Sequence, residues 1–135
     1  MKLREKLSRK LRKSKGFTLI EMLVVIAIIA ILVVVSVPMV NSSLDKAKTA
    51  TDDANERAAK AAALISYMTD DTVDGTSEVN YYYNADTGEA QKGSSAGITP
   101  YNQTKHDPVP AGEGCVKVTI NADGTLKEVA WEDIK

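Results

Sequence analysis

The longest uncharged stretch of this 135-residue chain runs from Met22 to Leu44, and it limits how the chain can fold. Its apolar core, Met22–Val40, covers 19 residues, and only Ser36 and Pro38 interrupt it. A helix needs about 20 consecutive apolar residues to cross a bilayer. The stretch therefore predicts a helix that can span a membrane.

The charged residues are segregated along the chain. Residues 1–16 hold eight of the 17 basic residues and one acid, so residues 17–135 hold 9 basic and 17 acidic residues. A basic segment before an apolar helix stays in the cytoplasm, so the C-terminal part is expected on the other side of the membrane. Because that part has a net charge of −8, it should bind phosphates poorly, and no nucleic acid partner is expected.

A second pattern follows the apolar stretch. Small or apolar residues recur at alternating spacings of three and four, which is typical of one face of an amphipathic helix. The helix is expected to end near Thr69, where the sequence DDTVDGTS contains helix breakers. A helix over Phe17–Met68 would be about 78 Å long, so roughly half of it must be covered by a membrane or by other copies of the chain. The predicted buried stripe consists of Leu44, Ala47, Thr51, Ala54, Ala58, Ala61, Ile65 and Met68.

The C-terminal half has the patterns of antiparallel strands. The sequence EVNYYYN (Glu78–Asn84) is rich in β-prone residues and is followed by the turn sequence ADTG. The alternating segments Cys115–Ile120 and Thr125–Trp131 flank the turn sequence NADG and predict a hairpin. The alternation slips between Leu126 and Val129, which predicts a bulge. Residues 92–114 have the composition of a loop.

These patterns predict the α+β class, with one long N-terminal helix whose C-terminal half packs on a small antiparallel sheet. Residues 1–16 form a charged leader, and residues 17–43 form a hydrophobic helix. Residues 44–135 form a globular head, in which an amphipathic helix over residues 44–69 and a loop precede the sheet over residues 78–135.

The glutamate at the start of the apolar stretch carries the strongest functional signal. A carboxylate in a membrane costs about 2.5 to 3.5 kcal/mol, so a plain anchor should not contain Glu21. The sequence KGFTLIEMLVVIAIIAIL closely resembles the class III leader junction of type IV pilins and pseudopilins. Gly16, Phe17 and Glu21 match each position of that motif, and Pro38 falls at the family's usual helix proline. The resemblance covers residues 1 to about 40.

The resemblance implies a route from precursor to filament. A prepilin peptidase would cut between Gly16 and Phe17 on the cytoplasmic side and methylate the new amine of Phe17. The single-pass subunit would wait in the cytoplasmic membrane until an assembly ATPase and a platform protein moved it into a helical surface filament. There, Glu21 would neutralise the N-terminal amine of another subunit, since neither charge is stable alone in a low-dielectric core. Pro38 would kink or loosen the helix.

Three functions remain open from the sequence. The first is a structural subunit of a type IV pilus that serves adhesion, motility or aggregation, without enzymatic activity or a cofactor. The second is a pseudopilin of a type II secretion or DNA-uptake system. The third is a binding protein exported by the Sec pathway, in which Val40 and Ser42 would precede the cut and the mature chain would begin at Ser43. Glu21 argues against the third function.

The single cysteine, Cys115, cannot form an intramolecular disulfide. It is expected to be a buried small residue, and an intermolecular bridge is the alternative. Many Gram-negative pilins close a C-terminal loop with a disulfide, so the chain looks more like the cysteine-poor pilins of Gram-positive bacteria.

The other candidate sites have simple structural interpretations. The segment DDTVDG matches an EF-hand calcium loop only at Asp70, Asp74 and Gly75, so a solvated loop without a metal is expected. His106 lies in a polar segment that suggests no second ligand or nucleophile, so it is not expected to be catalytic. The run Tyr81–Tyr83 is expected to alternate between sheet packing and the surface.

Overall fold

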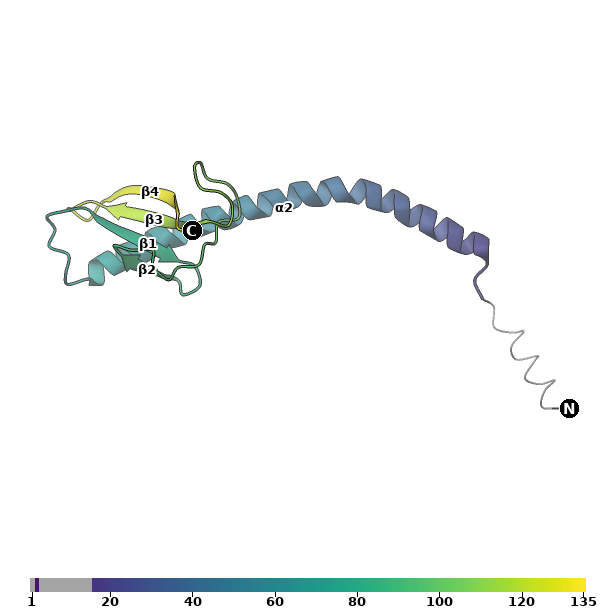
Figure 1. Ribbon diagram of the computed structural model, residues 1–135, viewed down its shortest axis with the longest axis horizontal. Coiled ribbons are helices and arrows are strands. Elements are labelled where there is room, and N and C mark those ends of the chain that lie inside the picture. The colour runs from purple at the N-terminus through teal and green to yellow at the C-terminus, as the bar shows by residue number, and fades with distance from the viewer. Residues whose placement is uncertain (1, 3–15) are drawn as a thin grey trace. The chain divides into compact units, whose positions relative to one another are not determined.

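A computed structural model describes Lys2 and residues 16–135 of the chain (Figure 1). The predicted leader, residues 1–16, lies outside the described residues except at its second and last positions. The described chain contains the helix α2 (Leu19–Thr69) and four strands. The strands are β1 (Val79–Asn84), β2 (Glu89–Lys92), β3 (Gly114–Ile120) and β4 (Leu126–Asp133). The chain consists of two compact units, and the boundary between them lies within α2. The second unit spans Ser43–Lys135.

The first unit contains the apolar half of α2. The helix continues through Pro38, and the Ser36 hydroxyl donates a hydrogen bond to the Leu32 carbonyl at 2.6 Å. This half is long and apolar enough to cross a membrane, and none of its most apolar 18-residue segment is buried. So much exposed apolar surface marks a membrane or protein interaction site.

In the second unit, one face of the sheet packs on α2 (Figure 1). The strand order is β2-β1-β3-β4, and all neighbouring strands are antiparallel. The alanines of α2 let the sheet approach closely, while the strands supply the bulky side chains of a close-packed core. The core consists of Ala59, Ala63, Tyr81, Tyr83, Val116, Val118 and Ile120. The predicted α+β class, with a long helix on a small antiparallel sheet, is confirmed.

The strands β3 and β4 form the predicted hairpin. Gly124 lies in its turn with a φ of 84°, a conformation that favours glycine. The β3–β4 register shifts between Thr119 and Ile120 and leaves Lys127 as the extra residue of the predicted bulge. The short edge strand β2 is not predicted from the sequence, because EAQK lacks an apolar alternation and pairs with β1 through its backbone.

The face of α2 that contacts the sheet is not the predicted one. The buried residues of α2 are Asp52, Ala59 and Ala63, whereas the predicted stripe is exposed except at the half-buried Ala58. Ile65 of that stripe is 62% exposed. The true face is offset by one residue, or about 100° around the helix. The prediction is wrong because the buried face includes a carboxylate whose partners come from a distant loop.

Candidate processing and assembly site

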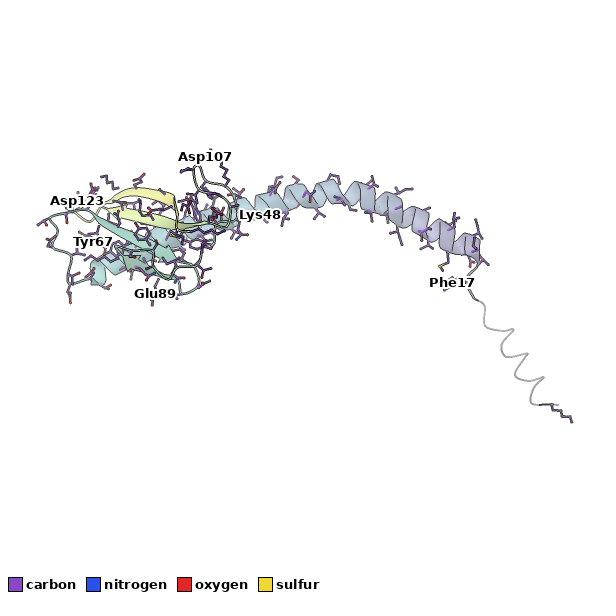
Figure 2. All side chains as sticks on the ribbon, in the orientation of Figure 1. Phe17, Lys48, Tyr67, Glu89, Asp107 and Asp123 are labelled. Atoms are coloured by element: carbon purple, nitrogen blue, oxygen red, sulfur yellow. The ribbon has the colours of Figure 1, made fainter. Side chains whose placement is uncertain are left out.

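The residues that match the leader motif lie at the N-terminal end of α2. Gly16, Phe17 and Thr18 precede Leu19, the first helical residue, and all three are exposed. The Phe17 side chain is 80% exposed and lies at the start of the helix (Figure 2). The bond between Gly16 and Phe17 is therefore outside the helix.

Thr18 and Glu21 form a reciprocal capping box. The Thr18 backbone N–H donates to Oε2 of Glu21 at 2.7 Å, and the Glu21 backbone N–H donates to Oγ1 of Thr18 at 3.2 Å. The Thr18 carbonyl accepts the N–H of Met22 at 3.2 Å, as an N-cap carbonyl does. The sequence TLIE is the S/T-x-x-E signature of this arrangement, a signal that could have revealed the local role of Glu21.

The capping box holds the Glu21 carboxylate at the positive end of the helix dipole. The backbone nitrogen of Phe17 is one residue before the Thr18 N–H that the carboxylate already accepts. A cut after Gly16 would change that nitrogen from a neutral amide into a cationic amine. The site can therefore present a carboxylate and a new amine at one end of an apolar helix.

Pro38 lies inside α2, with helix on both sides. Proline has no N–H, so the helix lacks one backbone hydrogen bond there. The kink or loosening of the helix at Pro38 stays a prediction.

A second polar cluster joins α2 to the loop between β2 and β3. The Asp52 carboxylate is 1% exposed and accepts the N–H groups of Gln103 and Thr104, both at 2.8 Å, and the Thr104 hydroxyl at 2.6 Å. Nε2 of His106 lies 2.9 Å from Oδ2 of Asp52. The imidazole stacks on Trp131 with ring centroids 4.5 Å apart. The partners are 51 or more positions from Asp52, so local sequence patterns do not reveal the cluster.

The geometry of this cluster differs from that of a catalytic triad. Oδ2 of Asp52 and Oγ1 of Thr104 approach the same ring nitrogen of His106, at 2.9 and 3.2 Å. In a catalytic triad the carboxylate orients one ring nitrogen, and the other nitrogen takes the proton of the nucleophile. Here the carboxylate instead accepts a hydrogen bond directly from the Thr104 hydroxyl. The cluster ties the loop to the helix.

Tyr101 and Asn102 tie the same loop to the sheet. The Tyr101 hydroxyl donates to the Tyr83 carbonyl at 3.1 Å and accepts the Val116 N–H at 2.8 Å, so it bridges β1 and β3. Burial raises the pKa of Tyr101, which keeps the hydroxyl protonated. The buried Asn102 side chain binds four backbone groups, namely the carbonyls of Thr104 and Pro110 and the N–H groups of Glu113 and Gly114.

The calcium-like segment is a loop held by its own side chains. Asp70 accepts hydrogen bonds from Thr72 and pairs with Lys92 at 2.9 Å. These two partners, Thr72 first, lower the pKa of Asp70 to about 2. Asp74 accepts the Thr76 N–H at 3.0 Å. Within Lys2 and residues 16–135, no group of three or more His, Cys, Asp or Glu side chains could hold a metal ion.

The predicted burial of Cys115 and the predicted alternation of the three tyrosines are confirmed. Cys115 is fully buried, and burial raises the pKa of its thiol to about 11. Tyr81 and Tyr83 are buried against α2, and Tyr82 is half-buried on the other face of the sheet.

Replacing Asp52 with asparagine is expected to lower the free energy of unfolding by about 2 kcal/mol at neutral pH. Burial by itself would raise the pKa of Asp52, but hydrogen bonds from Gln103, Thr104 and His106 outweigh it and hold the pKa below its usual value. A depressed pKa means that the stabilisation is complete above the unfolded value, about 3.9. It is lost as the pH falls through the lower pKa of the folded protein. The difference between wild type and variant should therefore close in acid.

The measurement is urea unfolding of the full chain in detergent, followed by the fluorescence of Trp131, the only tryptophan. The matched control is Asp53→Asn at the neighbouring exposed position, which should change stability by less than about 0.5 kcal/mol. Equal losses in the two variants, or an Asp52→Asn loss that does not vary with pH, would contradict the assigned role.

Comparison with known proteins identifies one feature of the chain. Residues 11–37 match the family model described as the prokaryotic N-terminal methylation motif. This motif is the class III leader of type IV pilins and pseudopilins, so the resemblance inferred from Gly16, Phe17 and Glu21 is confirmed. Type IV pilins and pseudopilins are structural proteins and not enzymes. No curated protein and no solved structure matches the chain.

Proposed function

We propose that the chain is the precursor of a type IV pilin, the structural subunit of a helical surface filament used in adhesion, motility or aggregation. The observation that carries the proposal is the leader motif over residues 11–37, placed on an apolar helix whose side chains are exposed. The head, which consists of a small sheet and an amphipathic helix, fits this role because it offers a folded surface to a filament.

Processing would take place at the start of α2. A prepilin peptidase would cut the exposed bond between Gly16 and Phe17 on the cytoplasmic side and methylate the Phe17 amine. The products would be a free leader, residues 1–16, and a subunit held in the cytoplasmic membrane by the apolar half of α2. The segregated charges support this orientation, because the basic segment would stay in the cytoplasm.

Assembly would move the apolar helix from lipid into a bundle of identical helices, driven by an assembly ATPase and a platform protein. The Phe17 amine and the Glu21 carboxylate of different subunits would pair. A buried pair is tolerated where either charge alone would be costly, so the pair favours one register between neighbours. Pro38 would let the helix loosen within the bundle.

A pseudopilin of a type II secretion or DNA-uptake system is the second candidate, because pseudopilins share this leader motif. Electron microscopy of filaments sheared from cells, with mass spectrometry of their main band, separates the two. A long filament composed mainly of this chain supports the pilin. A short periplasmic or cell-wall assembly would support the pseudopilin, if removing this chain also abolishes secretion or DNA uptake.

The mature protein is expected to begin with a methylated Phe17. Intact-mass measurement and sequencing of the N-terminal peptide, on protein from cells that contain a prepilin peptidase, would test this. The control is Gly16→Val, which should keep its leader because the peptidase reads mainly the residue before the cut. A wild-type chain that begins at Met1 would contradict the proposed function, and one that begins at Ser43 would support a Sec-exported protein.

A further inference from the structure

We propose that Thr18 is a positioning residue for leader removal, because its cap fixes the start of α2 and keeps the bond between Gly16 and Phe17 outside the helix. The proposal rests on the proposed function, since it concerns how the precursor meets its peptidase. It assigns a role to a residue that neither takes part in the cut nor carries a charge.

Three contacts place Thr18 at the boundary of the helix. Its carbonyl accepts the N–H of Met22 at 3.2 Å, which is the first hydrogen bond of the helical ladder. Its hydroxyl accepts the N–H of Glu21, and its own N–H donates to the Glu21 carboxylate. An N-cap residue has a non-helical backbone, so the chain leaves the helix at Thr18. Gly16 and Phe17 then lie on the exposed, non-helical side.

The start of an apolar helix such as α2 is well defined only when a residue caps it. The first four N–H groups of a helix have no partner within it, and near hydrocarbon there is little water to replace that partner. Without a cap at Thr18, the helix can lengthen toward Gly16, the next described residue that is able to cap it. This start would take Phe17 into the first helical turn.

A helical turn would hide the bond that the peptidase cuts. The enzyme must reach the Gly16 carbonyl carbon, and later the Phe17 nitrogen, from the side of the backbone. In a helix the peptide groups are packed into the wall of a cylinder and the carbonyls accept hydrogen bonds along it. The Thr18 cap therefore raises the fraction of precursor in which the bond is accessible.

The geometry of the capping box allows the effect of the Thr18 cap to be tested separately from the effect of the Glu21 charge. The hydroxyl of Thr18 accepts a backbone N–H, so this arm does not depend on the side chain of Glu21. Glutamine at position 21 can accept the Thr18 N–H as glutamate does, because both residues serve in capping boxes. Glu21→Gln thus removes the charge and keeps both arms of the cap.

The experiment follows the rate of leader removal from the full-length precursor in membranes that contain a prepilin peptidase. The test variant is Thr18→Val, which has nearly the shape of threonine but no hydroxyl. It should be cut roughly threefold to tenfold more slowly than wild type, at equal amounts of membrane-inserted precursor. Thr18→Ser and Thr18→Asn keep a capping side chain and should restore the wild-type rate. Glu21→Gln should also be cut at the wild-type rate.

Two results would overturn the proposal. The first is a Thr18→Val precursor that is cut as fast as wild type. The second is a Thr18→Asn precursor that is cut as slowly as Thr18→Val, which would mean that the peptidase reads the threonine itself. If wild type is not cut after Gly16 at all, the proposed function fails instead. The two failures are therefore distinguishable in one experiment.

Discussion

Cells that make only the Glu21→Gln variant are expected to carry no surface filaments, although the subunit is still cleaved and held in the membrane. Glutamine keeps the capping box with Thr18 but cannot neutralise a neighbouring amine. Each Phe17 amine would then enter the filament core unpaired. Removing one partner of a buried ion pair costs roughly 3 to 5 kcal/mol, and this cost recurs at every subunit.

The measurement counts surface filaments by electron microscopy and, separately, the cleaved subunit in the membrane by immunoblot. Glu21→Val removes the charge together with the carboxylate arm of the cap, and it should likewise insert and be cleaved without forming filaments. Thr18→Ser, which retains both arms and the charge, should assemble normally. Normal filaments from Glu21→Gln would show that the charge does not set the register. Loss of the subunit from the membrane would show that Glu21 acts in insertion.

Replacing Ala59 with glutamate is expected to destabilise the second unit by roughly 3 to 5 kcal/mol. Ala59 is fully buried between α2 and the sheet, where it contributes to the same cluster as Tyr81 and Val118. A carboxylate there would be buried without a partner and would push the helix away from the strands. Urea unfolding of the full chain in detergent, read from Trp131 fluorescence, measures the loss.

Ala61→Glu is the matched control, because it makes the same substitution two residues later on the same helix, at an exposed position. It should change the free energy of unfolding by less than about 0.5 kcal/mol. The comparison tests which face of α2 contacts the sheet, because Ala59 lies on the buried face of the structure and Ala61 lies on the stripe that the sequence periodicity predicts. A larger loss at Ala61 than at Ala59 would show that the sheet packs on the other face.

Local patterns predict much of this fold. The long apolar run predicts the first half of α2, and the breakers after Thr69 coincide with its end. The turn sequence NADG, which ends at Gly124, predicts the hairpin, and the slip in alternation after Leu126 predicts its bulge. The alternation of Tyr81 to Tyr83 predicts that neighbouring tyrosines lie on opposite faces of the sheet. Each of these features depends on residues that are close together in the chain.

The features that the sequence does not reveal depend on distant residues. Asp52 looks like a solvent-facing residue of a helix, but it is buried because a loop more than fifty positions later supplies its hydrogen-bond donors. In contrast, Ile65 has the spacing of a core residue and is exposed. Helical periodicity reports which side chains are apolar, and an alanine-rich helix has two faces small enough to approach a sheet. The choice between them is made by tertiary contacts.

The same reasoning applies to the candidate site. Gly16, Phe17 and Glu21 are recognisable because they form a short motif. Thr18 is less conspicuous, although its N–H, its hydroxyl and its carbonyl each form a hydrogen bond at the start of the helix. Its role as the N-cap of α2 follows from backbone geometry. In the sequence, only the three-residue spacing between Thr18 and Glu21 indicates that role.

The loop between β2 and β3 contains two groups of side chains, those that anchor the loop to the protein and those that are exposed. Tyr101, Asn102 and His106 form hydrogen bonds that hold the loop. In contrast, Lys105 and Asp107 are exposed, and Figure 2 shows Asp107 on the outside of the loop. The outward positions can change their charge or size while the inward anchors preserve the shape of the loop. In a filament, one such substitution would be repeated at regular intervals along the whole fibre. A single substitution would thus alter a multivalent surface of the proposed filament while the scaffold stays unchanged.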